Sequence, residues 1–319
     1  MFKISCHTWG FSDQPLEEAV QTIARLGFNA IDLGSGPHFD TDSAAKNPIK
    51  EAAAIRSLLD YFHLQIADLY LLLPALSSVD EGRRLYEVRL FERLLPFAME
   101  LGVPGITLSP GIETPEITEA RMPRSEAVEL RPAEKPEADT EMVTYQPPVL
   151  DPEQIETAPP SPTPFDHSVD SFRRIVEATE DFDLRVSFEP HLDSVAATPE
   201  KALIMLEKVP GLSLTLDWAQ FAAQGIISRE IEPLLPHTAH VQVRQATRGR
   251  LQTPYHEGSI DLQQVVTMLL DNDYRGTIAV EYMNRSGWHG MAALNIIQET
   301  GLTRDAIRNA RTRIMSNLD

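Results

Sequence analysis

Short apolar stretches alternate with longer segments of helical periodicity along the chain, and the alternation occurs about eight times. The expected strands are, in chain order, residues 2–11, 30–36, 65–73, 105–111, 185–191, 212–218, 240–246 and 277–283. Parallel strands need crossover helices of this kind, and eight such units can close on themselves. The pattern therefore predicts an α/β fold with a single (β/α)8 TIM barrel over residues 1–319.

Residues typical of helix ends support these boundaries. Asn47 and Thr198, each followed by proline, and Ser259 are expected to cap the starts of the helices that follow them. Gly27 and Gly102 follow a last helical turn, where a left-handed residue is favoured.

A doubly wound open sheet is the competing fold. It would be expected to carry a glycine-rich phosphate loop directly after the first strand. The segment HTWGFSDQP, residues 7–15, is not such a loop. We therefore favour the closed barrel.

One long segment after the fourth expected strand does not follow the alternation. Residues 112–164 contain 11 of the 24 prolines, and residues 113–156 contain 12 acidic and 4 basic side chains. Few large apolar residues are present to offset the entropy cost of ordering, so we expect a mobile Pro/Glu-rich insertion. It leaves the fourth strand at its C-terminal end, and a lid, a partner-binding arm and a solvated insertion without chemistry all remain open.

The charge balance excludes some classes of partner. The chain has 47 acidic and 28 basic residues, a net charge of −19, which disfavours binding to nucleic acid or to anionic membranes. A lone cysteine cannot form an internal disulfide, which favours a reducing compartment. The longest apolar run, residues 69–76, is too short to span a bilayer, and the N-terminal residues do not resemble a signal peptide. We expect a cytoplasmic protein.

Three expected strands end in a carboxylate. Glu189, Asp217 and Glu281 each follow an apolar strand core, at the end of a barrel where active sites lie. If they converge, they repel one another unless protons or a cation neutralise them, and a divalent metal is the simplest solution. The alternative is that each acid pairs with a nearby arginine or caps the following helix.

Several stretches together resemble a known family. SFEPH, LTLDWAQF, HVQVRQA, GSIDLQQVV and VEYM are similar, in order and spacing, to segments of the xylose isomerase-like TIM barrels, which include sugar and sugar-phosphate isomerases and epimerases. The resemblance covers most of the chain apart from residues 112–164. It implies one divalent cation, held by Glu189, Asp217, Gln242 and Glu281.

The chain departs from this family at two positions. Gln242 stands where members commonly have a histidine ligand, and Gln220 stands where they commonly have a histidine close to the substrate. An amide oxygen can bind a hard cation, so the all-oxygen set favours Mn²⁺ or Mg²⁺ over Zn²⁺. Strand alternation places His240 deeper in the barrel than Gln242, as an interior histidine bonded to a neighbouring strand, and places Arg244 nearer the mouth, where it either pairs with a strand-end carboxylate or contacts substrate.

Other polar residues near the expected mouth are candidates for substrate binding. His191, two residues after Glu189, could reach a substrate hydroxyl or serve in packing. His7 could form a sugar-stacking wall with Trp9, although a tryptophan there also suits the core. Arg248 lies where some family epimerases place a substrate-contacting arginine, and the alternative is a solvated loop residue.

The resemblance implies isomerisation or epimerisation of a sugar through an enediolate. In that chemistry Glu189 and Glu281 exchange the proton as general base and acid. Two alternatives remain open: a metal-dependent lyase or dehydratase acting on a sugar-derived keto acid, and a non-catalytic polyol-binding or scaffold barrel, because two histidines are replaced by glutamine. The expected partner is a small sugar or polyol, and homodimerisation is left open.

Overall fold

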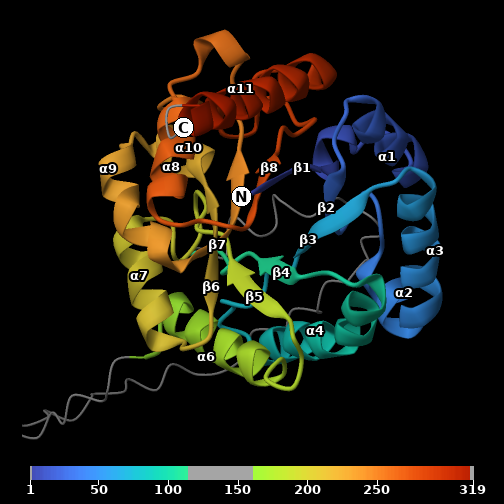
Figure 1. The fold of residues 1–319 in the computed structure, drawn as a ribbon. Coiled ribbons are helices and arrows are strands. Elements are labelled where there is room, and N and C mark those ends of the chain that lie inside the picture. The colour runs from blue at the N-terminus through green and yellow to red at the C-terminus, as the bar shows by residue number, and fades with distance from the viewer. Residues whose placement is uncertain (1, 114–160, 317–319) are drawn as a thin grey trace, which may run out of the picture.

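Eight parallel strands form one closed barrel in which each strand pairs with the next in sequence and β8 pairs with β1 (Figure 1). The computed structural model describes residues 2–113 and 161–316. The predicted (β/α)8 TIM barrel is confirmed. The segment 112–164, which was predicted to be mobile, lies almost entirely outside the described residues, which resume just before α6.

All eight predicted strands are present, although most end earlier than the apolar patterns suggest. Their bounds are β1 Lys3–His7, β2 Ala30–Gly34, β3 Gln65–Leu71, β4 Gly105–Leu108, β5 Arg185–Phe188, β6 Ser213–Asp217, β7 Thr238–Val243 and β8 Thr277–Val280. At some strand ends, the last residue of the strand also caps the helix that follows. His7 caps the 3-10 helix Thr8–Phe11, and Asp217 caps α8.

The helices follow one another around the barrel in chain order (Figure 1). Their bounds are α1 Leu16–Arg25, α2 Thr41–Lys46, α3 Pro48–Tyr61, α4 Glu81–Leu101, α6 Pro164–Glu177, α7 Pro199–Lys208, α8 Trp218–Gln224, α9 Ser228–Ile231, α10 Leu262–Asp271 and α11 Ile296–Ser316. Among the helices of the described residues, none has both the length and the apolar character to cross a bilayer.

The predicted helix ends are right in most cases. Thr198 accepts a hydrogen bond from the Lys201 backbone N–H at 3.3 Å, and the backbone φ of Gly102 is 75°. Asn47 precedes α3 as predicted, but its side chain makes no capping hydrogen bond. Ser259 is wrong as a cap: α10 begins two residues later than expected, because Asp261 accepts hydrogen bonds from two backbone N–H groups there.

Apolar side chains pack between the barrel and its helices, while the barrel interior is polar. Outward-facing strand residues such as Leu33, Ile106 and Phe188 are buried in the hydrophobic core. Inward-facing positions carry hydroxyls and charges, as Ser5 and Thr215 illustrate, and both are fully buried. The interior therefore needs internal hydrogen bonds and ion pairs, because a buried polar group without a partner is costly.

Loops at the C-terminal ends of the strands are tied to the helices behind them. Ser171 and Ser168 of α6 donate hydrogen bonds to backbone carbonyls at Leu76 and Pro110, at 2.7 and 2.6 Å. Glu87 of α4 accepts from the Ala75 N–H at 2.6 Å, and burial raises its pKa to about 8. These bonds hold the rim around the mouth of the barrel.

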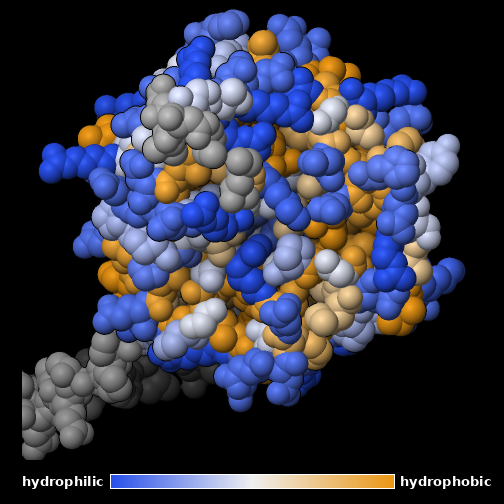
Figure 2. All heavy atoms as spheres, in the orientation of Figure 1, coloured by the Kyte–Doolittle hydropathy of each residue, from blue (hydrophilic) through white to orange (hydrophobic). Residues whose placement is uncertain are grey.

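The surface is mixed in character. Figure 2 shows hydrophilic residues over much of one face, with hydrophobic residues between them. The large apolar side chains that are exposed include Ile49 and Tyr61 on α3 and Tyr86 and Met99 on α4.

Candidate functional site

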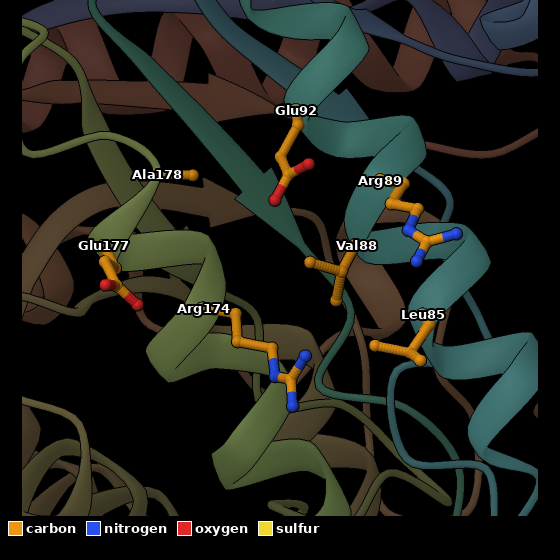
Figure 3. A pocket seen from close by; sticks show the side chains of 7 residues that line it. All are labelled: Leu85, Val88, Arg89, Glu92, Arg174, Glu177 and Ala178. Carbon is orange, nitrogen blue, oxygen red and sulfur yellow. The ribbon is translucent and has the colours of Figure 1, made fainter.

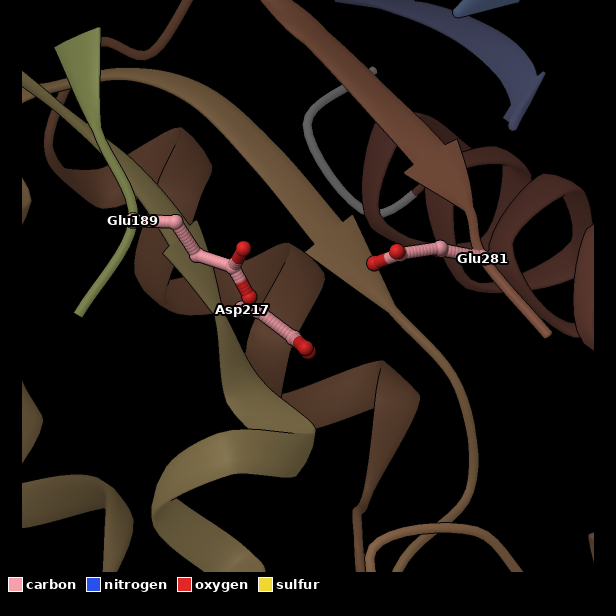
Figure 4. Close-up of side chains that lie close together, drawn as sticks. All are labelled: Glu189, Asp217 and Glu281. Atoms are coloured by element: carbon pink, nitrogen blue, oxygen red, sulfur yellow. The ribbon is translucent and has the colours of Figure 1, made fainter. Parts of the chain in front are cut away.

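The three strand-end carboxylates meet inside the barrel. Glu189 directly follows β5, Asp217 ends β6 and Glu281 directly follows β8. One carboxylate oxygen from each lies within 4.8 Å of the other two, and all three side chains are buried. Figure 4 shows them pointing toward one another from their strands. The predicted convergence is therefore what the structure shows.

Arg244 lies against two of these carboxylates and is fully buried. Its Nη1 is 2.9 Å from Glu281 Oε2 and 3.0 Å from the Glu281 carbonyl oxygen. Its Nη2 is 2.9 Å from Asp217 Oδ2, without the alignment of a hydrogen bond. Asp217 Oδ1 also accepts from the Ala219 N–H at 2.9 Å and so caps α8. Asp217 thus belongs to the cluster and also has both alternative roles, because it pairs with an arginine and caps a helix.

The cluster has more negative than positive charge. With all three carboxylates ionised, the one guanidinium leaves two negative charges unbalanced. Burial raises the pKa of Asp217 to about 6, with Arg244 opposing the shift and Glu189 adding to it. Burial likewise raises the pKa of Glu281 well above its ordinary range, again against Arg244. The cluster is thus set to take up either protons or a cation.

Both oxygens of Glu189 accept hydrogen bonds. Tyr70 donates its hydroxyl to Oε2 at 2.6 Å, and Gln220 donates from Nε2 to Oε1 at 3.0 Å. The Gln220 amide oxygen in turn accepts from the Leu192 N–H at 3.1 Å. Gln220, predicted to bind substrate, here links Glu189 to the loop after β5. Tyr70 is a residue that the sequence analysis missed; its only signal is that it follows Asp68 by two positions, on the inward side of β3.

Gln242 also faces the barrel interior, beside Asp217 in the register of β6 and β7. Its side chain is fully buried, and among the described residues neither its amide oxygen nor its amide nitrogen has a hydrogen-bond partner. Among the described residues Asp217 Oδ2 has only the ion-pair contact with Arg244 and no hydrogen bond. An amide is costly to bury without a partner, so the Gln242 side chain is the kind of group that a bound ion or ligand would satisfy.

An aromatic wall lies beside the carboxylates. The ring of Trp9 is 4.5 Å from that of His7 and 4.7 Å from that of Tyr70, between centroids. The Trp9 backbone N–H donates to His7 Nδ1 at 3.1 Å, which places the imidazole proton on Nε2. Burial lowers the pKa of His7 to about 3, so the ring is neutral. Gly34 leaves room for this wall, because a Cβ there would lie 2.3 Å from Trp9 Nε1.

His191 is hydrogen-bonded to Ser109, a residue that the sequence analysis did not single out. His191 Nε2 lies 2.7 Å from Ser109 Oγ, and His191 Nδ1 lies 2.7 Å from the Leu192 carbonyl oxygen. Since the carbonyl can only accept, the Nδ1 carries the proton and the serine donates to Nε2. Ser109 and Glu189 directly follow the neighbouring strands β4 and β5, so the pair lies at the same end of the barrel as the cluster.

Two loop arginines follow β7. Arg248 is exposed, and its predicted contact with substrate remains a prediction. Arg250 pairs with Glu257 at 3.0 Å on the surface.

A charged network fills the barrel interior on the side of the strand starts. His240 Nε2 lies 2.6 Å from Asp32 Oδ2, and Arg185 lies 3.0 Å from Asp68. His240 is an interior histidine as predicted, but its partner stands across the barrel on β2 rather than on a neighbouring strand. Burial alone would lower the pKa of His240, and the Asp32 and Asp68 carboxylates raise it above the ordinary value.

A surface groove of about 340 Å³ lies between α4 and α6, outside the barrel (Figure 3). It is lined by Leu85, Val88, Arg89, Glu92, Arg174, Glu177 and Ala178. None of these residues belongs to the carboxylate cluster, so the groove is not part of the site.

Solved structures with the same fold include sugar epimerases. The D-allulose 3-epimerase from Methylomonas sp. superposes with a TM-score of 0.67 at 15% identity, covering 97% of this chain and 98% of that one. The probable 3-DHS dehydratase from Bacillus anthracis gives 0.62 at 16% identity, covering 96% and 99%. A xylose isomerase-like TIM barrel protein from Mycobacterium smegmatis, in complex with magnesium, gives 0.63 at 16% identity, covering 97% and 98%.

Sequence comparison assigns the family. No curated protein matches the sequence. Because the family model described as xylose isomerase-like TIM barrel matches residues 20–312, which is most of the chain, the protein belongs to this family.

Proposed function

We propose that this protein is an enzyme that moves a proton at the carbon next to a carbonyl group, and so isomerises or epimerises a sugar or sugar phosphate. The observation that carries the proposal is the meeting of Glu189, Asp217 and Glu281 inside the barrel (Figure 4). Carboxylates gathered at the C-terminal end of a barrel are typical of catalysis rather than of stability. Family membership and the fold shared with the Methylomonas epimerase support a sugar-like substrate.

The residues of the cluster fit a divalent cation. Three buried carboxylates offer oxygens close together, and Gln242 Oε1 lacks a hydrogen-bond partner within the described part of the chain. We infer that Glu189, Asp217, Gln242 and Glu281 hold the ion, and that an all-oxygen set favours Mn²⁺ or Mg²⁺. Bound there, such a cation would supply Lewis acidity for a reaction next to a carbonyl group.

Glu189 and Glu281 are the proposed proton carriers. They approach the centre of the cluster from β5 and β8 (Figure 4). Glu189 takes the proton from the substrate carbon, and Glu281 returns a proton to complete the exchange. Tyr70 and Gln220 each hold one oxygen of Glu189, which fixes the direction of the carboxylate.

The polar groups around the cluster are proposed to bind the substrate's hydroxyls. His7 offers an Nε2–H that has no partner among the described residues. Ser109 and His191 form a second polar pair beside Glu189. Trp9 provides a ring face of the kind that packs against the apolar side of a sugar.

The test of the proposed function is solvent proton exchange. A panel of ketoses, aldoses and their phosphates is incubated with the protein in D2O with Mn²⁺ or Mg²⁺, and deuterium entering the carbon beside the carbonyl is followed by NMR. Exchange accompanied by a new sugar isomer supports the proposal. An absence of exchange across the panel, with the metal bound, argues instead for a polyol-binding or scaffold barrel.

Dehydration is a second candidate, favoured by the Ser109–His191 pair. Loss of a hydroxyl next to an enolate needs an acid that protonates the leaving oxygen. An imidazolium at His191, protonated on Nε2 as well, would pass that proton to the Ser109 hydroxyl 2.7 Å away as the serine gives its own proton to the leaving oxygen, which leaves a neutral imidazole. Release of water to give an unsaturated or deoxy keto product in the same panel would identify this reaction.

Removal of two carboxylates is expected to abolish metal binding. An Asp217→Asn/Glu281→Gln variant should bind Mn²⁺ more than about 100-fold more weakly, because even outer-shell changes cost up to about that factor. Titration calorimetry on chelator-treated protein measures the affinity, and circular dichroism checks the fold. Glu257→Gln, on the surface, is the matched control. Undiminished affinity in the double variant would place the metal elsewhere.

Restoring the family's histidine at position 242 is expected to change metal preference. A Gln242→His variant should bind Zn²⁺ about tenfold more tightly or better, because imidazole suits Zn²⁺ more than an amide oxygen does. Mg²⁺ affinity should change little or fall. Competition between Zn²⁺ and Mg²⁺ followed by calorimetry measures the ratio. An unchanged ratio would show that residue 242 does not contact the ion.

A further inference from the structure

Arg244 is the residue of the cluster for which the proposed function gives no task. Each of its guanidinium nitrogens is engaged. Nε donates to the Leu251 carbonyl at 3.2 Å, Nη1 contacts Glu281 twice, and Nη2 lies 2.9 Å from Asp217. With no exposed surface, the side chain is a poor candidate for binding a substrate anion.

The position of Arg244 sets the charge of the cluster. Three ionised carboxylates and one guanidinium leave a net charge of −2, and a divalent cation would bring the buried cluster to neutrality. Without the arginine, the same cation would leave one negative charge buried. Burying unbalanced charge is expensive, so the arginine offsets part of the cluster's negative charge before any ion binds.

We propose that Arg244 is a built-in counter-cation that keeps Asp217 and Glu281 in place in the metal-free protein and lowers the affinity of the cluster for a divalent ion. The first part follows from geometry, since one planar group contacts carboxylates from β6 and β8 and spans the intervening β7. The second part follows from Coulomb repulsion between the guanidinium and the incoming ion, which is strong in a buried site. The inference rests on the metal site of the proposed function.

The proposal distinguishes Arg244 from an ordinary structural arginine. Arg185 also points into the barrel and pairs with an aspartate, but its partner Asp68 belongs to the deeper network. A structural role alone predicts that both arginines stabilise the fold and that neither affects metal affinity. A counter-cation role predicts that the arginine at position 244 weakens metal binding and that the arginine at position 185 does not.

The experiment compares Arg244→Met with Arg185→Met as matched control. Mn²⁺ is titrated by calorimetry into chelator-treated proteins near neutral pH, and thermal unfolding is recorded with EDTA and with saturating Mn²⁺. Arg244→Met should bind Mn²⁺ about tenfold more tightly or better than the wild type. Its melting temperature in EDTA should fall by roughly 5 to 10 °C, and Mn²⁺ should recover most of that loss. Arg185→Met should melt earlier with unchanged Mn²⁺ affinity.

A second pair of variants tests the proposal if Arg244→Met folds poorly. Arg244→Lys keeps the positive charge, but its single ammonium group cannot reach both carboxylates. Arg244→Gln removes the positive charge and keeps a polar side chain. The proposal expects lysine to retain near wild-type Mn²⁺ affinity and glutamine to tighten it.

The outcomes separate this proposal from the proposed function. If the wild type binds Mn²⁺ and the neutral variants bind it no more tightly, the counter-cation role fails while the metal site stands. If neither the wild type nor any neutral variant binds Mn²⁺, both fail together. Binding by the neutral variants alone supports the proposal in its strongest form, with the arginine excluding the ion.

Discussion

Replacing Glu189 by glutamine is expected to lower turnover by about 1,000-fold or more, within the range assigned to general acid–base groups. The amide keeps the size of the side chain but cannot accept a proton from carbon. Its one amide oxygen can accept the bond from Gln220, and its amide nitrogen can donate to the Tyr70 hydroxyl instead of accepting from it, so the fold should be retained. The measurement is the rate of deuterium incorporation into the best substrate of the panel.

The control for this variant is the same substitution on the outside of the barrel. Glu177 on α6 lines the surface groove of Figure 3, and Glu177→Gln should leave the rate unchanged. Mn²⁺ affinity is measured for both variants, so that a loss of rate through a loss of metal is recognised. Undiminished exchange by folded Glu189→Gln would remove Glu189 from the proposed mechanism.

Replacing His240 by glutamine is expected to destabilise the protein by about 3–5 kcal/mol, the cost of breaking a buried ion pair. The variant removes the ion-pair partner of buried Asp32, while Asp68 keeps its contact with Arg185. Urea unfolding near neutral pH measures the loss of unfolding free energy. His256→Gln, at an exposed position in the short 3-10 helix Tyr255–Glu257, is the matched control and should change the free energy of unfolding little.

The same variant should also change how stability depends on pH. The folded-state pKa of His240 is raised above its ordinary value of 6.5 by Asp32 and Asp68, against the effect of burial. A group with a raised pKa stabilises the fold fully below its unfolded pKa, and that contribution is lost as pH rises through the folded pKa. The stability difference between wild type and His240→Gln should therefore shrink as pH rises above about 6.5. A constant difference would show that His240 is neutral in the folded protein.

The barrel could be predicted because its signals are local. Strand and helix periods, caps such as Thr198 and the acids at the strand ends are all visible within a few residues of sequence. Ser259 was wrong because Asp261, an equally good cap two residues later, begins α10 instead. Roles proposed for the site residues stay predictions, although the convergence of the carboxylates is shown.

Contacts across the barrel could not be predicted in the same way. Alternation indicates that His240 and Arg244 face inward, but the stagger of the strands decides which residue they meet. His240 meets Asp32 on β2. For Arg244 the sequence allows either a carboxylate or a substrate as partner, and the structure shows contacts with carboxylates from β6 and β8. Tyr70 was missed because it stands in an apolar run, and only its hydroxyl, bonded to Glu189, marks it as polar.

The charged interior on the side of the strand starts has an evolutionary consequence. Asp32 with His240, and Asp68 with Arg185, bring together strands that lie far apart in the sequence. Loss of either member of a pair leaves a buried charge without its partner. A protein with a single substitution is therefore less fit than both the original and the double replacement. The lineage that carries this barrel can thus exchange these residues for apolar ones only in coordinated steps, while exposed loop positions such as Arg248 can vary one residue at a time.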